Sequence, residues 1–352
     1  MDKIKVLVVD DSAIVRDILS QTIEKQSDME LVGTAPDPYI ARDKIVRLNP
    51  DVITLDIEMP RMDGLTFLEK LMYYNPLPVI IVSSITTKDN LAAIKALELG
   101  AYDIVNKPGG SITVEDVKED VLQKIRSAYT NRETFLTKWL DLNKNVLKTK
   151  IKKDRSLLTQ IKTTDKLIAI GSSTGGTVAL EYIFTNLPKN LPPIVVVQHM
   201  PEVFTAQFAK RLNELSELNI KEGEQDELIE IGTVYIAPGG RHMEIKRVGA
   251  SLFINLTDDE KVNFQRPAVD PLFYSVAKNV GINAMAILLT GMGKDGAMGL
   301  LKIKESGGTT IAQDERTSVV WGMPKVAIDL NAANEVLPLD KIVHRIIEYS
   351  IK

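Results

Sequence analysis

Short apolar runs alternate with segments of helical spacing through the first 125 residues of the chain. The apolar runs are typical of buried strands and fall at residues 5–9, 30–34, 51–55, 79–82 and 102–105. Between and after them, apolar residues recur every three or four positions over residues 13–25, 39–48, 65–74, 90–99 and 114–127. Strands that alternate with helices in this way predict a doubly wound, five-stranded parallel sheet.

A second strand and helix pattern occupies residues 166–352 and begins with the stretch Leu167 to Gly176. Its apolar start predicts a buried strand, and its glycines predict a tight turn into a helix. Further strands are expected at 194–197, 232–237, 243–245, 251–254 and 284–289, with helices at 202–215, 270–278 and from about 297. Segments at 309–312, 323–328 and 341–349 complete the pattern. We expect an α/β domain with a mostly parallel sheet.

The pattern weakens between these two parts, over residues 127–165. Five lysines lie within eleven residues there, among some helical spacing: Lys144, Lys148, Lys150, Lys152 and Lys153. The sequence therefore predicts a domain over residues 1–126, a charged, partly helical linker over 127–165, and a second domain over 166–352.

Composition narrows the possible functions. The net charge of −4 argues against a nucleic-acid partner held by phosphate contacts. The chain has no cysteine, which excludes disulfides, thiolate metal sites and thiol catalysis. We find no apolar run of about 18 residues and expect no direct membrane insertion. These features favour a cytoplasmic protein.

Polar residues collect at the ends of the predicted strands of the first domain. They are Asp10, Asp11, Asp56, Ser83 and Lys107. Carboxylates that converge in one crevice repel each other and need a cation, and hard oxygen ligands suit Mg²⁺. The metal and Lys107 would neutralise a phosphoryl group transferred to Asp56. A single aspartate in such a place could be a turn former or helix cap, but the whole set is poorly explained in that way.

Three residues of the second domain also follow predicted strands: Ser173, His199 and Asp295. If those strands are parallel, the three side chains lie along one edge of the sheet. A serine needs a histidine to take its proton and a carboxylate to orient the histidine, so this set fits acyl transfer. Each residue alone could instead be a turn former, a structural histidine or a helix cap. A nucleotide pocket at residues 171–176 is the alternative for this turn.

The first set of residues resembles the receiver domain of two-component response regulators, from residue 3 to about 125. The resemblance implies that Asp56 is the phosphoacceptor and that Asp10, Asp11 and Asp56 hold Mg²⁺, with a backbone carbonyl from Glu58. It also implies that Ser83 is the switch hydroxyl and that Lys107 binds the phosphoryl group. Ile104 stands where many receivers have an aromatic residue.

The second domain resembles the catalytic domain of chemotaxis protein-glutamate methylesterases. The motifs that carry the resemblance are Gly-Ser-Ser-Thr-Gly-Gly, Gln-His-Met-Pro, Ala-Pro-Gly-Gly, Arg-Pro-Ala-Val-Asp and Thr-Gly-Met-Gly-Lys-Asp-Gly-Ala. On this resemblance the triad is Ser173, His199 and Asp295, with Thr174 and the backbone of Met292 supporting the active site or oxyanion hole. The residue before the nucleophile is commonly alanine in the family. Here it is Ser172, which leaves Ser172 as an alternative nucleophile.

The family resemblance implies a function in sensory adaptation. It implies hydrolysis of glutamate γ-methyl esters, and deamidation of glutamines, on the cytoplasmic helices of methyl-accepting chemoreceptors. The phosphodonor would be a chemotaxis histidine kinase, and the protein would be recruited to membrane-bound receptor arrays. No cofactor is expected in the catalytic domain. We hypothesise that the unphosphorylated receiver covers the Ser173 edge. The alternative is a response regulator whose output domain binds a nucleotide or partner without catalysis.

Overall fold

The computed structural model describes residues 3–84, 87–107, 113–145 and 165–351, and the chain divides into two compact units. The units are Met1–Val146 and Leu147–Lys352. Most of the lysine-rich segment predicted as a linker lies outside the described residues. Among the helices that are described, none is both long and apolar enough to cross a bilayer.

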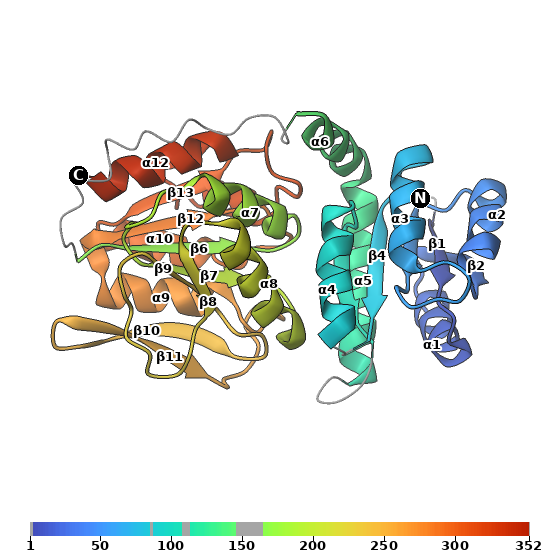
Figure 1. The fold of residues 1–352 in the computed structure, drawn as a ribbon, viewed down its shortest axis with the longest axis horizontal. Helices are drawn as coiled ribbons and strands as arrows, with labels where there is room; N and C mark the ends of the chain where they lie inside the picture. The colour runs from blue at the N-terminus through green and yellow to red at the C-terminus, as the bar shows by residue number, and fades with distance from the viewer. Residues whose placement is uncertain (1–2, 85–86, 108–112, 146–164, 352) are drawn as a thin grey trace. The chain divides into compact units, whose positions relative to one another are not determined.

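The N-terminal unit is built on a five-stranded sheet in which every neighbouring pair is parallel (Figure 1). The strand order is β2-β1-β3-β4-β5, which confirms the predicted doubly wound fold. The strands are β1 Ile4–Val9, β2 Met29–Ala35, β3 Val52–Leu55, β4 Val79–Ser83 and β5 Asp103–Asn106. The helices between and after them are α1 Ala13–Glu24, α2 Pro38–Leu48, α3 Gly64–Tyr74, α4 Thr87–Glu98 and α5 Val114–Thr130.

Helices cover both faces of this sheet, and local side chains fix where they begin. Helices α1 and α5 pack on one face, and α2, α3 and α4 lie on the other. Ser12 caps α1 through its hydroxyl, and the carboxylates of Asp37 and Asp63 cap α2 and α3. Each cap satisfies backbone N–H groups that the first turn of a helix leaves without a partner.

A further helix, α6 Arg132–Asn145, packs on the N-terminal unit, although its residues were predicted to lie in the linker. The Phe135 ring is buried and meets the Tyr102 ring edge-on, with 5.0 Å between the centroids. Arg132 forms an ion pair with Asp51 at 2.5 Å. Residues 132–145 are therefore anchored by packing and charge, and the linker boundaries at 127 and 165 stay a prediction.

The C-terminal unit contains a seven-stranded sheet, again with every neighbouring pair parallel. The order is β14-β13-β12-β6-β7-β9-β8. The strands are β6 Leu167–Ser172, β7 Ile194–Gln198, β8 Asn219–Glu222, β9 Thr233–Ile236, β12 Ala284–Leu288, β13 Thr309–Gln313 and β14 Glu335–Leu337. A separate antiparallel pair is formed by β10 His242–Val248 and β11 Ser251–Thr257. The predicted mostly parallel α/β fold is confirmed.

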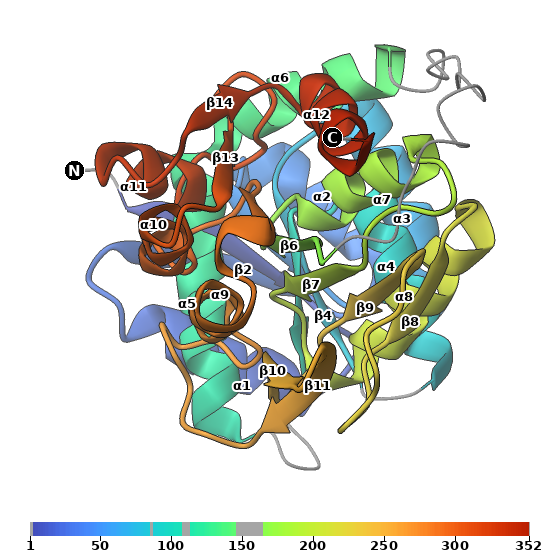
Figure 2. The same ribbon diagram turned by 90° about the vertical axis from the view of Figure 1, so that its left-hand side faces the viewer.

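Two layers of helices enclose the seven-stranded sheet (Figure 2). One face carries α7 Gly176–Asn186, α8 Glu202–Leu215 and α12 Leu339–Ile351, and the other carries α9 Val269–Asn279, α10 Ala297–Glu305 and α11 Met323–Asp329. The core beneath α9 is closely packed, with Val269, Leu272 and Phe273 fully buried against the sheet. Burial of such side chains is the main favourable contribution to folding.

The carboxyl end of β6 is a switch point of the seven-stranded sheet. Strand β7 pairs with β6 on one side and β12 pairs with it on the other, so the direction of winding reverses at β6. Ligands of open α/β sheets bind at such switch points, outside the carboxyl ends of the strands. In the N-terminal unit the corresponding point lies between β1 and β3.

Candidate functional site

Three carboxylates meet at the switch point of the N-terminal unit. Oxygens of Asp10, Asp11 and Asp56 all lie within 4.8 Å of one another. The ammonium of Lys107 bridges two of them, at 2.9 Å from Asp10 Oδ2 and 2.8 Å from Asp56 Oδ2. The parallel pairing of β1 with β3 brings Asp10 and Asp56 together, because each residue follows the end of its strand.

Burial disfavours the ionised form of two of these three carboxylates, those of Asp10 and Asp56. Burial raises the pKa of Asp56 to about 6, because it outweighs the hydrogen bond and charge of Lys107, which lower that pKa; the charge of Asp10 raises it further. Burial also raises the pKa of Asp10. Within the described part of the chain, Asp10 Oδ2 and Asp56 Oδ2 accept no hydrogen bond beyond their ion pairs with Lys107. The cluster therefore fits a small, hard divalent cation such as Mg²⁺.

Ser83 and Glu58, the other two residues predicted for this site, differ in burial. Ser83 is buried at the end of β4, opposite Asn106 in the register with β5, and its carbonyl accepts the Lys107 N–H at 2.8 Å. The loop after β3 carries Glu58, whose side chain is exposed two residues beyond Asp56. The structure thus places the Ser83 hydroxyl and the Lys107 ammonium at the ends of neighbouring strands.

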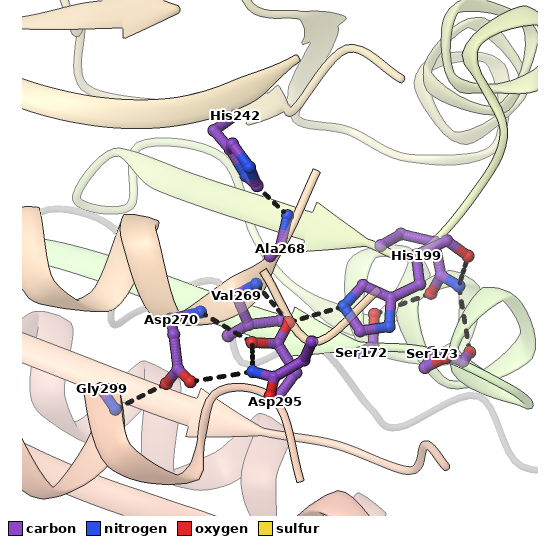
Figure 3. Close-up of polar contacts among 11 residues, drawn as sticks. Ser172, Ser173, His199, His242, Ala268, Val269, Asp270, Asp295 and Gly299 are labelled. Carbon is purple, nitrogen blue, oxygen red and sulfur yellow. Dashed lines mark hydrogen bonds and ion pairs between the residues drawn. The ribbon is translucent and has the colours of Figure 1, made fainter. Parts of the chain in front are cut away.

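In the C-terminal unit, the structure brings His199 and Asp295 into direct contact. His199 follows β7, Asp295 lies in the loop between β12 and α10, and their Nε2 and Oδ2 atoms are 2.7 Å apart (Figure 3). The two side chains are 5% and 2% exposed. An ionised carboxylate only accepts hydrogen bonds, so Nε2 carries the hydrogen of this pair and Nδ1 keeps its lone pair.

The Asp295 carboxylate is held by backbone and side-chain donors. Oδ2 also accepts the N–H of Val269 at 2.6 Å, while Oδ1 accepts the N–H of Asp270 at 3.2 Å and the Asn263 amide at 3.0 Å. Burial raises the pKa of Asp295, but His199 and these donors outweigh burial and hold that pKa below its usual range. Asp295 is therefore ionised at neutral pH and can orient and stabilise an imidazolium.

The two neighbouring serines lie in different environments. Ser172 is the last residue of β6, is fully buried, and donates its hydroxyl to Gln198 Oε1 at 2.7 Å. That bond follows from register, because Ser172 and Gln198 are paired residues of β6 and β7. Ser173 is the next residue and is partly exposed at the carboxyl end of the sheet. Figure 3 shows both serines on the side of the cluster where His199 lies.

Thr174 and the loop before Asp295 complete the surroundings of Ser173. The Ser173 N–H donates to the Thr290 carbonyl at 3.0 Å, and the Thr290 hydroxyl donates to the Thr174 carbonyl at 2.9 Å. A Cβ added at Gly291 would lie 2.7 Å from the Ser173 Cβ, so only glycine permits this approach. Met292 follows in the same loop and is half-buried.

Gln198, Asn263 and Asp270 contribute to the site but were not among the residues predicted for it. Asp270 lay within one quoted motif, and Gln198 lay beside His199 in another. Asn263 has a left-handed backbone, with φ of 51°, in the loop before α9. Left-handed non-glycine residues cluster at functional sites, but this conformation leaves no signature in the sequence. These contacts join polar side chains of different strands, helices and loops, so hydrophobic periodicity gave no signal for them.

Comparisons with known proteins agree with this geometry. Residues 168–346 match the family model of the CheB methylesterase, and residues 6–117 match that of the response regulator receiver domain. A protein-glutamate methylesterase/protein-glutamine glutaminase 2 from Syntrophus aciditrophicus is 49% identical over 99% of both chains. One from Salmonella typhi, named protein-glutamate methylesterase/protein-glutamine glutaminase, is 47% identical over 97% of this chain and 95% of its own length.

A solved structure is similar to the C-terminal unit. The crystal structure of the Thermotoga maritima CheB methylesterase catalytic domain is 48% identical, with a TM-score of 0.52. The match covers 53% of this chain and 99% of that one. The chain therefore belongs to the CheB methylesterase family and carries a response regulator receiver domain ahead of its methylesterase domain.

Proposed function

We propose that this protein hydrolyses the γ-methyl esters of glutamate side chains, and deamidates glutamine side chains, on methyl-accepting chemoreceptors. The named activities of relatives that are 47% and 49% identical over nearly the full chain support this function. Both reactions transfer the acyl group of a side-chain carbonyl, so one serine-based site can perform them. The single observation that carries the catalytic assignment is the buried His199–Asp295 pair at the strand end next to Ser173.

Ser173 is the nucleophile in this proposal. Ser172 is fully buried and its hydroxyl is committed to Gln198, so it is unfavourably placed to meet a side chain on another protein. Ser173 is partly exposed and lies just before α7. The positive end of that helix dipole favours negative charge that develops beside it.

The reaction begins when Ser173 Oγ attacks the ester carbonyl carbon and His199 takes the hydroxyl proton at Nδ1. Nδ1 is the acceptor because Asp295 occupies Nε2. The tetrahedral intermediate then breaks its bond to the methoxy oxygen, which leaves as methanol with the proton from His199. Water attacks the acyl-enzyme with His199 again as base, and glutamate and free Ser173 result. A glutamine releases ammonia in place of methanol.

The oxyanion is assigned to backbone N–H groups at the start of α7 and in the loop after β12. We place Thr174 and Met292 in this role, because the first follows Ser173 and the second lies in the loop whose Gly291 packs against Ser173. Such donors are worth about 10²–10³-fold in rate in other acyl-transfer enzymes. The catalytic unit acts without a cofactor in this mechanism.

The receiver domain supplies control by phosphorylation. Asp56 accepts the phosphoryl group from a histidine kinase of the chemotaxis pathway, while Lys107 and Ser83 bind its oxygens. Asp10, Asp11 and Asp56, with the backbone carbonyl of Glu58, would hold Mg²⁺, which neutralises charge on the phosphoryl group during transfer. The support is the carboxylate cluster and its contact with Lys107.

We propose residues 1–126 and 166–352 as the two domains, and a cytoplasmic site of action at receptor arrays.

The test compares the two serines in the full chain. Methanol release from carboxyl-methylated chemoreceptors is measured for the wild type, Ser173→Ala and Ser172→Ala. We expect Ser173→Ala to lose about 10⁴-fold or more, because the nucleophile is gone. Ser172→Ala should keep the chemistry and lose only stability, because a buried hydrogen bond to Gln198 disappears.

Each result decides between alternatives. Loss of activity in Ser172→Ala alone would move the nucleophile to Ser172. Wild-type protein that releases no more methanol than Ser173→Ala would favour an output domain that binds a partner without catalysis.

A further inference from the structure

A second buried aspartate, which the proposed reaction does not use, lies beside Asp295. Asp270 is in the first turn of α9 and is 5% exposed, and Asp295 is 2% exposed. Burying two carboxylates in contact with the same amide is costly, because like charges repel and water is excluded. Such an arrangement persists only where other groups hold it in place, and the partners of Asp270 are therefore informative.

The Asn263 side chain joins the two carboxylates. Its Nδ2 donates to Asp295 Oδ1 at 3.0 Å and to Asp270 Oδ2 at 3.3 Å, so the two hydrogens of one amide group are shared between two acids. An amide nitrogen has two hydrogens, and both are used here. Rotation of the Asp295 carboxylate away from His199 would break this bridge.

The other Asp270 oxygen ties the bridge to helix α10. Asp270 Oδ1 accepts the N–H of Gly299 at 2.7 Å, and a Cβ at Gly299 would lie 3.1 Å from that oxygen. The N–H of Asp270 itself donates to Asp295 Oδ1 at 3.2 Å. Figure 3 shows Asp270 between Gly299 on one side and the Asp295 cluster on the other. Asp270 thus links α9, α10 and the loop that carries Asp295.

We propose that Asp270 is a positioning residue that acts, through Asn263, to hold Asp295 in line with His199 and to add negative charge next to Asp295. This inference rests on the proposed esterase function. Asp270 touches neither the serines nor the substrate in this role. Its effect is on the geometry of the His199–Asp295 pair and on the electrostatic cost of forming the imidazolium.

Titratable groups from three elements surround Asp270. Asp295 comes from the loop before α10, its partner His199 from the end of β7, and Tyr274 from α9. Burial, followed by the charge of Asp295, raises the pKa of Asp270 to about 6. The pKa of Tyr274 is raised by burial, followed by the charges of Asp270 and Asp295. Asp270 is therefore an anion at pH 7.5, and its charge lies within the cluster that holds Asp295.

The test separates this role from a purely structural one. Asp270→Asn removes the negative charge and places the new amide next to the Asn263 amide. Asn263→Ala removes the side chain that joins Asp270 to Asp295. Ser275→Ala is the matched control, because Ser275 anchors the same helix α9 to β10 by accepting the Ile245 N–H at 2.9 Å. All full-length variants carry Asp56→Asn, so that position 56 neither titrates nor becomes phosphorylated. Methanol release from methylated chemoreceptors is measured between pH 5 and 9.

We expect Asp270→Asn and Asn263→Ala each to lower kcat by about 10- to 100-fold with KM nearly unchanged, since a small displacement of a catalytic group costs about this much. The double variant should be little worse than either single one, because the two residues act as a unit. Removing negative charge near the imidazole disfavours the imidazolium. The acid limb of kcat/KM should therefore move to lower pH in Asp270→Asn, and Ser275→Ala should leave it in place.

The inference is overturned if Asp270→Asn and Asn263→Ala keep the wild-type kcat and acid limb, or if Ser275→Ala shifts the limb as far. If Asp270→Asn does not fold, Asn263→Ala alone decides by its kcat relative to Ser275→Ala. Failure of the proposed function has a different signature, because the wild-type site would then release no methanol above Ser173→Ala.

Discussion

Pairs of identical residues in this chain have different surroundings and therefore different chemistry. Ser172 is buried against Gln198, whereas Ser173 is partly exposed one residue later. Asp295 is kept ionised by His199 and backbone donors, whereas burial raises the pKa of Asp270. Residue type alone would give each member of a pair the same role. The two serines differ because adjacent residues at the end of a strand point to opposite sides, and the two aspartates differ because they have different hydrogen-bond partners.

Asp56 gives a prediction at the residue scale, because its raised pKa has a stability cost. The folded protein keeps the Asp56 proton up to about pH 6, while the unfolded chain loses it near pH 3.8. Stability therefore falls as pH rises through this window, and the cost is fully present above it. We expect Asp56→Asn to stabilise the N-terminal unit at pH 7.5 without Mg²⁺, by on the order of 2 kcal/mol.

The measurement is the unfolding free energy from hydrogen exchange of the β1 and β3 amides, with and without Mg²⁺. The advantage of Asp56→Asn should shrink as pH is lowered through about 6, because the wild-type carboxylate then becomes neutral. Added Mg²⁺ should also reduce it, since the cation stabilises only the intact cluster. An advantage that is equal at pH 4.5 and pH 7.5 would contradict the electrostatic origin.

Much of the candidate site could be predicted from residues at strand ends, and the rest could not. Asp10, Asp56, His199 and Asp295 follow apolar runs, and parallel pairing brings such positions together. Asn263 comes to the site on an irregular loop with a left-handed backbone, so neither spacing nor composition indicated it. Asp295 contacts Nε2 of His199 and not Nδ1 because of how the imidazole ring is turned, and the sequence does not predict that orientation.

At the scale of elements, strand β6 lies at the centre of the seven-stranded sheet, and its residue Gly171 packs against the helix that holds Asp295. A Cβ at Gly171 would lie 2.3 Å from Val269 Cγ1, and the N–H of Val269 donates to Asp295. We expect Gly171→Ala to push α9 away, lowering stability by about 1–3 kcal/mol. It should also lower kcat by about tenfold or more, because Asp295 loses its alignment. Thermal unfolding and methanol release measure the two effects.

Gly249→Ala is the control for Gly171→Ala. Gly249 lies in the turn between β10 and β11, has φ of 60°, and has no atom within 4 Å of an added Cβ. The left-handed backbone should cost about 1–2 kcal/mol without touching the site, so stability should fall and kcat should not. Equal loss of kcat in both variants, or unchanged kcat in Gly171→Ala, would show that packing at Gly171 does not reach Asp295.

The elements that the sequence analysis missed share physical features. Strands β8 and β14 are only four and three residues long and lie at the two edges of the seven-stranded sheet. Edge strands are buried on fewer sides, so their hydrophobic signal is weak. The residues of helix α6 were expected in a partly helical linker because polar residues dominate there, yet Phe135 buries its ring against Tyr102. The order in which strands pair was also not available from periodicity.

At the scale of the whole molecule, a phosphoryl switch and an esterase site share one chain. Unit Leu147–Lys352 has its own sheet and buried core, and a catalytic domain from Thermotoga maritima that covers 53% of this chain was crystallised separately. We therefore expect a fragment lacking residues 1–160 to fold. If the unphosphorylated receiver inhibits the esterase, this fragment should release methanol faster than the unphosphorylated full chain, by about 5- to 150-fold for a coupling of about 1–3 kcal/mol.

Inhibition by the unphosphorylated receiver also predicts that phosphorylation of Asp56 activates the full chain. A small-molecule phosphodonor with Mg²⁺ should activate the full chain toward the rate of the fragment, and should change neither the fragment nor full-length Asp56→Asn. Coupling between two sites is reciprocal for binding free energies but not for rates. The effect of phosphorylation on kcat therefore does not require that a bound receptor fragment change the rate of Asp56 phosphorylation. A fragment no faster than the unphosphorylated full chain would mean that the receiver activates without first inhibiting. Phosphorylation would then have to create a contribution to catalysis that the isolated C-terminal unit lacks.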